Sequence, residues 1–139
     1  MNSLNLKLVI AMARSYNKLF SHIEKNVQEY GFTLSEFGVL EFLWHKGKQP
    51  VQKIAEKILV TSGTITYIID KLQKNGLVER KKCENDKRVY YVGLTPKGEE
   101  VIGKLFPKHQ QFIDNLLAGI DEDVKKNLLR SLLDLRASI

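Results

Sequence analysis

The side chains with the clearest chemical purpose are five cations that lie close together in the middle of the chain. They flank a short polar stretch: Arg80, Lys81, Lys82, Lys87 and Arg88. Clustered lysines and arginines bind phosphate groups and displace the counterions of a nucleic acid, and an arginine also fits a narrow minor groove. The segment therefore indicates a polyanionic partner, for which nucleic acid is the first candidate and an anionic membrane the second.

The net charge of +6 comes from the same central part of the chain as these cations. Residues 1–45 carry four basic and four acidic side chains, and residues 89–139 carry seven of each. Residues 46–88 hold the remaining eleven basic and five acidic groups, so the whole excess of positive charge lies there. A basic segment concentrated in this way favours nucleic acid as the partner, although charge alone is also compatible with a solvated lysine-rich surface.

A helix with a polar outer face is predicted immediately before the cations. Thr61 is suited to cap its first turn, Gly76 is suited to end it, and its inner face is apolar at helical spacing: Ile65, Ile68, Ile69 and Leu72. The outer face is rich in hydroxyl groups and mildly basic, with Gly63, Thr66, Tyr67, Asp70 and Lys74 outward and Thr64 and Lys71 at the edges. Such side chains contact base edges and phosphates in a major groove, where a glycine lets the backbone approach closely.

Two further elements complete a DNA-binding module around this helix. A short helix is predicted over residues 51–58, and only Leu59-Val60-Thr61 separates it from the next, which is typical of a helix-turn-helix. After Gly76 the pattern changes from helical to extended over residues 77–82 and 88–94, which predicts a β-hairpin with a charged tip. A helix-turn-helix followed by a basic hairpin is a winged helix.

Long amphipathic helices are predicted on both sides of the winged helix. One covers residues 6–30, and a second follows Thr33 and Glu36, which stand at capping-box spacing. A third runs from Thr95-Pro96 to Gly119 with a kink or a break at Pro107, and a last one begins at Asp121. The terminal helices carry more apolar surface than the central part covers, so we expect a homodimer, whose two-fold symmetry matches a palindromic operator.

The predicted fold is therefore a single domain over residues 1–139, mainly α with a small β-hairpin wing, in the α+β class. Residues 33–94 form the winged helix-turn-helix DNA-binding part, and residues 1–32 and 95–139 form the dimerisation helices. No apolar run approaches the roughly 20 residues of a membrane span, and the N-terminus lacks the features of a signal peptide. We expect a cytoplasmic protein that does not bind a membrane, and the single cysteine agrees with a reducing compartment.

Five short motifs, taken together, resemble the MarR family of bacterial transcriptional regulators nearly from end to end. They are Val60-Thr61-Ser62-Gly63-Thr64-Ile65-Thr66, Asp70-Lys71-Leu72, Asn75-Gly76-Leu77-Val78-Glu79-Arg80, Asn85-Asp86-Lys87-Arg88 and Leu94-Thr95-Pro96-Lys97-Gly98. The resemblance implies that residues 61–71 are the recognition helix of a repressor, that the terminal helices dimerise, and that Arg88 enters the minor groove with Asp86 and Arg80 as its positioning partners. The DNA-binding set is then Thr61, Ser62, Gly63, Thr64, Thr66, Tyr67, Lys71, Lys74, Lys82, Lys87 and Arg88.

The resemblance also implies a small aromatic or phenolic effector that relieves repression. Many relatives have an arginine where this chain has Tyr67, and a tyrosine there is similar to the subgroup that represses genes for detoxifying quinones and phenols. The aromatic side chains that we expect to line an effector pocket are Tyr16, Phe20, Trp44 and Phe112, although aromatic residues at helical spacing also serve as ordinary core.

Other chemistry receives less support from the sequence. Cys83 lies beside the cation Lys82, so it is either a redox residue or an incidental thiol; the first-helix cysteine of peroxide-sensing relatives is absent. The histidines (His22, His45 and His109) match no metal-binding spacing, and no phosphate loop, nucleophile elbow or triad is present, so we expect no metal, no cofactor and no enzyme. A winged helix that binds RNA or protein is the alternative function.

Overall fold

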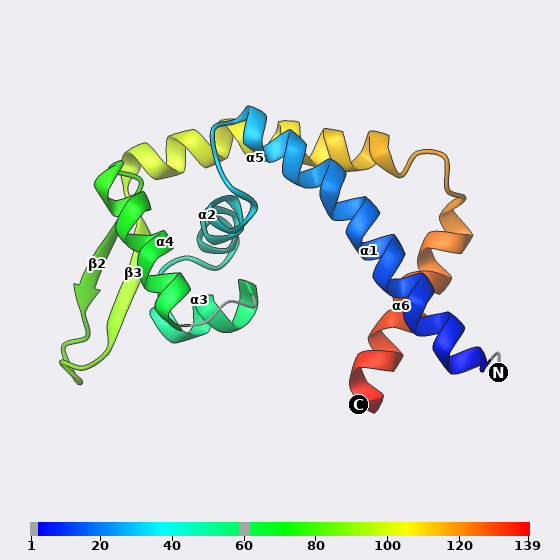
Figure 1. Cartoon of the computed structure of the whole chain (residues 1–139). Helices are drawn as coiled ribbons and strands as arrows, with labels where there is room; N and C mark the ends of the chain where they lie inside the picture. The colour runs from blue at the N-terminus through cyan, green and yellow to red at the C-terminus, as the bar shows by residue number, and fades with distance from the viewer. Residues whose placement is uncertain (1–2, 59–61) are drawn as a thin grey trace. The chain divides into compact units, whose positions relative to one another are not determined.

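The computed structural model of the chain describes residues 3–58 and 62–139 (Figure 1). The chain forms two compact units, residues 1–109 and 110–139, and each is described by itself. The predicted turn at residues 59–61, with its proposed cap Thr61, lies outside the described residues. Helices dominate both units, and a small antiparallel sheet accompanies them in the first, which confirms the predicted fold class.

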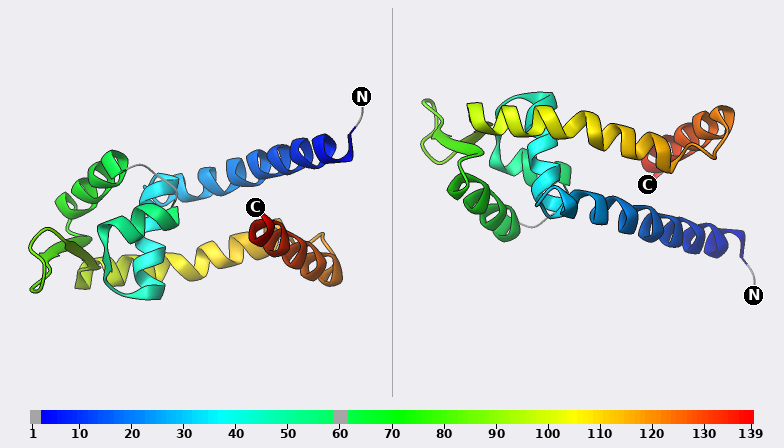
Figure 2. Two further views of the ribbon diagram at one scale, coloured as in Figure 1. Left: turned by 90° about the horizontal axis from the view of Figure 1, so that it is seen from below. Right: turned by 90° about the horizontal axis from the view of Figure 1, so that it is seen from above.

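The first unit contains the winged helix and the long helix that precedes it. Its elements in chain order are α1 (Leu4–Glu29), α2 (Leu34–Lys46), β1 (Gln49–Pro50), α3 (Val51–Ile58), α4 (Ser62–Lys74), β2 (Val78–Lys82), β3 (Tyr90–Leu94) and the first part of α5 (Pro96–Leu116). Figure 1 and the two views in Figure 2 show the β2–β3 hairpin beside α4, as the winged-helix prediction requires.

The predicted helix ends follow from local chemistry. Gly31 takes a left-handed backbone conformation, with φ 90°, just after α1, where a residue with a side chain is disfavoured. At the start of α2 the capping box is complete, because the Thr33 N–H donates to Glu36 Oε1 at 2.7 Å and the Glu36 N–H donates to Thr33 Oγ1 at 3.1 Å. The spacing of these residues in the sequence was therefore a reliable signal.

The sheet has one strand more than the sequence predicts. Its order is β1-β3-β2, and all neighbouring strands are antiparallel. The predicted hairpin is present, with Arg80 opposite Val92 and Lys82 opposite Tyr90. The additional strand β1 is only Gln49–Pro50, which pairs with Val92 and Tyr91. A strand of two residues has no alternation of polar and apolar side chains, so nothing in the sequence distinguishes it from a loop.

The core of the first unit lies around α4, between that helix, the other helices of the unit and the sheet. The predicted inner face of α4 is buried, with exposed fractions of 5% or less for Ile65, Ile68, Ile69 and Leu72. These side chains share the core with the following fully buried residues of neighbouring elements: Phe37, Leu40, Ile54, Val78, Val92 and Ile102. Burial of such side chains stabilises the fold by about 1.5–3 kcal/mol each and fixes which face of α4 points to solvent.

A tight junction joins the end of α4 to the start of α5, and it explains two of the sequence motifs. The Thr95 hydroxyl donates to the Gly76 carbonyl oxygen, the Thr95 N–H donates to the Leu77 carbonyl oxygen at 3.1 Å, and Lys97 Nζ donates to the Asn75 carbonyl oxygen at 3.0 Å. Gly98 is buried at this junction. The motif around Gly76 and the motif around Thr95 are thus two sides of one contact.

The second unit is a helical hairpin. It contains the end of α5 and the whole of α6 (Glu122–Ser138), whose N-cap Asp121 accepts from the Asp123 N–H at 3.3 Å. Upstream of this unit, α5 continues through Pro107, so the helix does not break there. No residue of α6 is buried, and its apolar residues are exposed: Val124, Leu128, Leu129, Leu132 and Leu133.

Substitution of Gly98 by alanine is expected to destabilise the first unit strongly. A Cβ atom at position 98 would lie 2.0 Å from the Leu77 carbonyl oxygen, and a backbone atom cannot move aside as a flexible side chain does. Overpacking usually costs about 1–3 kcal/mol, and this overlap belongs at the upper end of that range. Urea unfolding followed by circular dichroism measures the loss. Gly119→Ala is the control, because its Cβ meets nothing within 4 Å, and equal stability of the two variants would contradict the expectation.

Candidate nucleic-acid interface

The outer face of α4 is the first part of the site. Tyr67 is 71% exposed, and Thr64, Thr66, Asp70 and Lys74 are exposed as well. Ser62 and Gly63 form the start of α4. Since the opposite face of the helix is buried in the core, the polar side chains project from the module as one surface of hydroxyl, phenol and charged groups.

Arg80 of β2 ties the wing to α4. Its Nη1 donates to Gln73 Oε1 at 2.7 Å, and its Nη2 pairs with the carboxylate of Asp70 and lies 3.4 Å from the Thr66 carbonyl oxygen. The resemblance implied that Arg80 positions Arg88 together with Asp86. In the structure the Arg80 guanidinium contacts α4, so the residue links β2 to that helix.

Asp86 and Arg88 form a compact unit at the tip of the wing. One oxygen of Asp86 accepts from the Arg88 N–H at 3.0 Å and from its Nε at 3.2 Å, and the other oxygen lies 3.4 Å from Nη2. The backbone N–H and then the guanidinium of Arg88 hold the pKa of Asp86 below its ordinary value, so the carboxylate is charged at neutral pH. The Arg88 side chain is 91% exposed. The pair therefore presents a guanidinium to solvent in a defined orientation.

The remaining cations of the wing lie on its strands and its tip. Lys82 Nζ lies 5.8 Å from the centroid of the Tyr90 ring, which is within cation–π range, and Lys81 Nζ lies 3.9 Å from Glu79 Oε1. Lys87 is exposed at the tip. Part of the charge excess in residues 46–88 is therefore displayed on the surface of the wing.

Lys71 makes a contact that sequence reasoning missed. Its Nζ lies 3.1 Å from Glu36 Oε2, and the Glu36 side chain is only 4% exposed while that of Lys71 is 48% exposed. Burial raises the pKa of Glu36, but hydrogen bonds from Thr33 and Lys71 outweigh burial and hold the pKa below its ordinary value. The sequence assigned Glu36 to the cap of α2 and Lys71 to the DNA surface, and no spacing rule connects residues on two different helices.

Comparison with known proteins identifies the family. The model of the MarR family matches residues 32–90, which include the helix-turn-helix and most of the wing. The HTH-type transcriptional regulator MhqR of Bacillus subtilis (strain 168) is 40% identical over 123 residues, or 88% of this chain and 85% of that protein. This chain belongs to the MarR family. It is accordingly a DNA-binding transcriptional regulator.

Solved structures of MarR-type regulators have the same fold. Sco3205 of Streptomyces coelicolor, solved in complex with DNA, matches with a TM-score of 0.84 and 21% identity, over 99% of this chain and 88% of that one. NadR, solved in complex with 4-hydroxyphenylacetate, matches with a TM-score of 0.77 and 24% identity, over 100% of this chain and 95% of that one. At such identities the likeness shows the fold alone.

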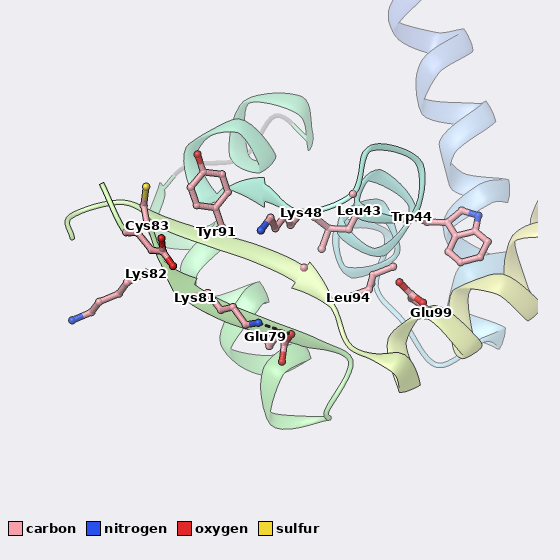
Figure 3. A pocket seen from close by; sticks show the side chains of 13 residues that line it. Leu43, Trp44, Lys48, Glu79, Lys81, Lys82, Cys83, Tyr91, Leu94 and Glu99 are labelled. Carbon is pink, nitrogen blue, oxygen red and sulfur yellow. Dashed lines mark ion pairs between the residues drawn. The ribbon is translucent and has the colours of Figure 1, made fainter. Parts of the chain in front are cut away.

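The structure places the four aromatic residues expected in an effector pocket of this MarR chain on different elements. A groove of about 880 Å³ lies against the wing sheet, and Trp44 lines it together with Lys48, Tyr91 and Cys83 (Figure 3). Tyr16 and Phe20 stack on each other along α1 with ring centroids 4.5 Å apart. Phe112 belongs to the second unit. Of the four residues, only Trp44 lines the groove.

Two buried polar atoms of the first unit have no hydrogen-bond partner within the described part of the chain. They are Asn26 Oδ1 on α1 and His109 Nδ1 on α5. The His109 ring packs against Phe37, with centroids 4.8 Å apart and the ring planes tilted by 53°. Burial lowers the pKa of His109 and outweighs the nearby carboxylate of Glu41, which raises it. A buried polar atom without a partner costs free energy, so a ligand that supplies the missing hydrogen bond is stabilised at such a position.

The described residues of this MarR chain contain neither a group of side chains suited to hold a metal ion nor a helix suited to cross a membrane. Within residues 3–58 and 62–139, no three His, Cys, Asp or Glu side chains are grouped so that they hold a metal ion. The helices of the same residues also lack the combination of length and apolar character that a membrane crossing needs. The histidine nearest to a carboxylate, His45, lies 4.0 Å from Glu41 in a pair one helical turn apart.

Proposed function

We propose that the chain is a homodimeric repressor that binds a pseudo-palindromic operator and blocks the polymerase. Each α4 enters a major groove, and each wing places Arg88 in the adjacent minor groove. The observation that carries the proposal is the exposed polar face of α4 next to an exposed arginine that Asp86 holds in place. The described residues of the predicted DNA-binding set, from Ser62 to Arg88, belong either to α4 or to the wing.

Arg88→Ala is expected to weaken operator binding and to reduce its dependence on salt. The loss of one cation from the minor groove, where it neutralises nearby phosphate charge, lowers the slope of log K against log salt by about 0.9, because fewer counterions are released. Gel shifts at several salt concentrations, with a duplex that the wild-type chain enriches from a genomic library, measure the slope. Arg14→Ala on the exposed surface of α1 is the control. A slope that changes equally in the two variants would argue against a DNA contact by the wing.

The dimer proposal depends on apolar surface that neither unit covers by itself. In the first unit, residues of the first turns of α1 are exposed: Leu4, Leu6, Leu8, Val9 and Ile10. In the second unit, the apolar residues of α6 are exposed, and Leu129 is 60% exposed. Exposed apolar helix surface of this kind is typical of an interface, and a two-fold dimer suits a two-fold operator.

Leu129→Glu is expected to convert the dimer into monomers in sedimentation-velocity experiments. Burial of a leucine contributes about 1.5–3 kcal/mol, and a two-fold interface loses this contribution twice when both copies carry the change. Asn127→Glu, which adds the same charge at an exposed polar position of α6, is the control and should leave the dimer intact. The same sedimentation coefficient for Leu129→Glu and the wild type would refute a role of α6 in dimerisation.

We further propose that a small hydroxylated aromatic molecule releases the chain from DNA by changing the spacing between the two recognition helices. The unpartnered Asn26 Oδ1 and His109 Nδ1 support this proposal, because a phenolic hydroxyl is able to donate to an amide oxygen and to accept from an imidazole N–H. The Phe37 ring packs against His109, so an aromatic environment surrounds one of the two atoms. The complex of NadR with 4-hydroxyphenylacetate is a precedent within the same fold.

Catechol or 4-hydroxyphenylacetate is expected to release the wild-type chain from DNA, and His109→Phe is expected to abolish the release. The phenylalanine keeps a ring on Phe37 but supplies no polar atom. Fluorescence anisotropy of a labelled duplex measures both effects, with cyclohexylacetate as the non-aromatic compound and His22→Phe, at an exposed position, as the matched variant. Release from the His109→Phe variant as efficient as from the wild type would place the effector elsewhere.

A further inference from the structure

Helix α4 is attached to its neighbours along two opposite edges. Helical spacing puts Asp70 and Gln73 on one edge, where Arg80 of β2 binds both. The same spacing puts Lys71 on the other edge, where Glu36 of α2 binds it. The side chains between these edges form the outer face of the helix. Rotation of α4 about its own axis therefore strains one attachment or the other.

The Glu36 carboxylate serves two helices at once. Its Oε1 accepts from the Thr33 N–H at 2.7 Å and so begins α2, while its Oε2 pairs with Lys71 Nζ at 3.1 Å and so holds α4. The carboxylate is almost completely buried, whereas the lysine is half-exposed. A buried carboxylate strongly disfavours the loss of its cation, so the pair constrains the position of Lys71 more than a surface ion pair does.

We propose that Glu36 is a positioning residue for DNA recognition, and that through Lys71 it sets the rotation of α4 and thereby which side chains meet the base edges. The inference rests on the proposed binding of DNA by α4. It assigns Lys71 a role different from that of a simple phosphate contact. Because the charge of its ammonium is balanced by Glu36, Lys71 releases few counterions when DNA binds.

The two roles of Lys71 make different predictions for sequence-specific and non-specific binding. A phosphate contact supports every DNA sequence equally and contributes to the salt dependence. A positioning contact acts on the base edges through the orientation of α4, so its loss weakens the operator complex and spares binding to unrelated DNA. The ratio of the two affinities therefore separates the roles, and overall stability by itself does not change this ratio.

Three variants test the pair without removing the cap of α2. Glu36→Gln keeps an oxygen for the Thr33 N–H, because glutamine also completes a capping box, but it removes the charge. Lys71→Met keeps the apolar stem and removes the ammonium. Lys71→Arg keeps a cation for Glu36 and serves as the conservative variant. The probes are the duplex enriched by the wild-type chain and a scrambled duplex of the same composition, with thermal unfolding as a check on folding.

Glu36→Gln and Lys71→Met are each expected to weaken operator binding about tenfold, which corresponds to about 1.4 kcal/mol, and to change binding of the scrambled duplex less than about twofold. The slope of log K against log salt should not fall, and Lys71→Arg should behave like the wild type. A double variant that carries both Glu36→Gln and Lys71→Met should bind the operator no more weakly than either single variant. If Glu36→Gln fails to fold, Lys71→Met, which changes a half-exposed position, tests the positioning role by itself.

Equal losses on both duplexes, with a slope reduced by about 0.9 for Lys71→Met, would make Lys71 a phosphate contact and overturn the inference. An unchanged ratio of affinities in both single variants would overturn it as well, while leaving DNA binding by α4 intact. A wild-type chain that enriches no duplex would instead refute the proposed function, and the inference would fail with it.

Discussion

Burial of one apolar stripe of α4 is the constraint on which the DNA-binding surface depends. Because Ile65, Ile69 and Leu72 are held in the core, the hydroxyl and phenol groups on the opposite face of α4 point to solvent. The ion pairs of Arg80 and Lys71 then act on a helix whose orientation is already limited to a small range. Hydrophobic burial supplies most of the free energy that holds α4 in place, and the polar contacts refine the orientation of the helix.

The parts of the fold that the sequence predicts well depend on local interactions. The capping box of Thr33 and Glu36, the glycine after α1 and the apolar stripe of α4 each involve residues a few positions apart, so spacing is sufficient to recognise them. The hairpin was equally visible, because β-branched and aromatic residues alternate along its second strand.

The parts that the sequence did not reveal depend on contacts between distant segments. The second oxygen of Glu36 bonds a lysine on another helix, Arg80 reaches Gln73, and Gly98 is needed only because the Leu77 carbonyl lies against it. The aromatic residues were ambiguous for a related reason, since Trp44 and Phe20 at helical spacing look the same whether they form core or line a groove. The type of a residue shows which partners it is able to bind, but the folded structure determines which of them it contacts.

Helix α5 is shared by the two units of the chain. Its first residues are bonded to the end of α4 through Thr95 and Lys97, while its last turns belong to the second unit, so a single continuous rod links the two. Pro107 has no N–H, and the rod therefore lacks one of its backbone hydrogen bonds near the boundary between the units. The missing hydrogen bond makes Pro107 the position in α5 at which bending costs the least backbone hydrogen-bond energy.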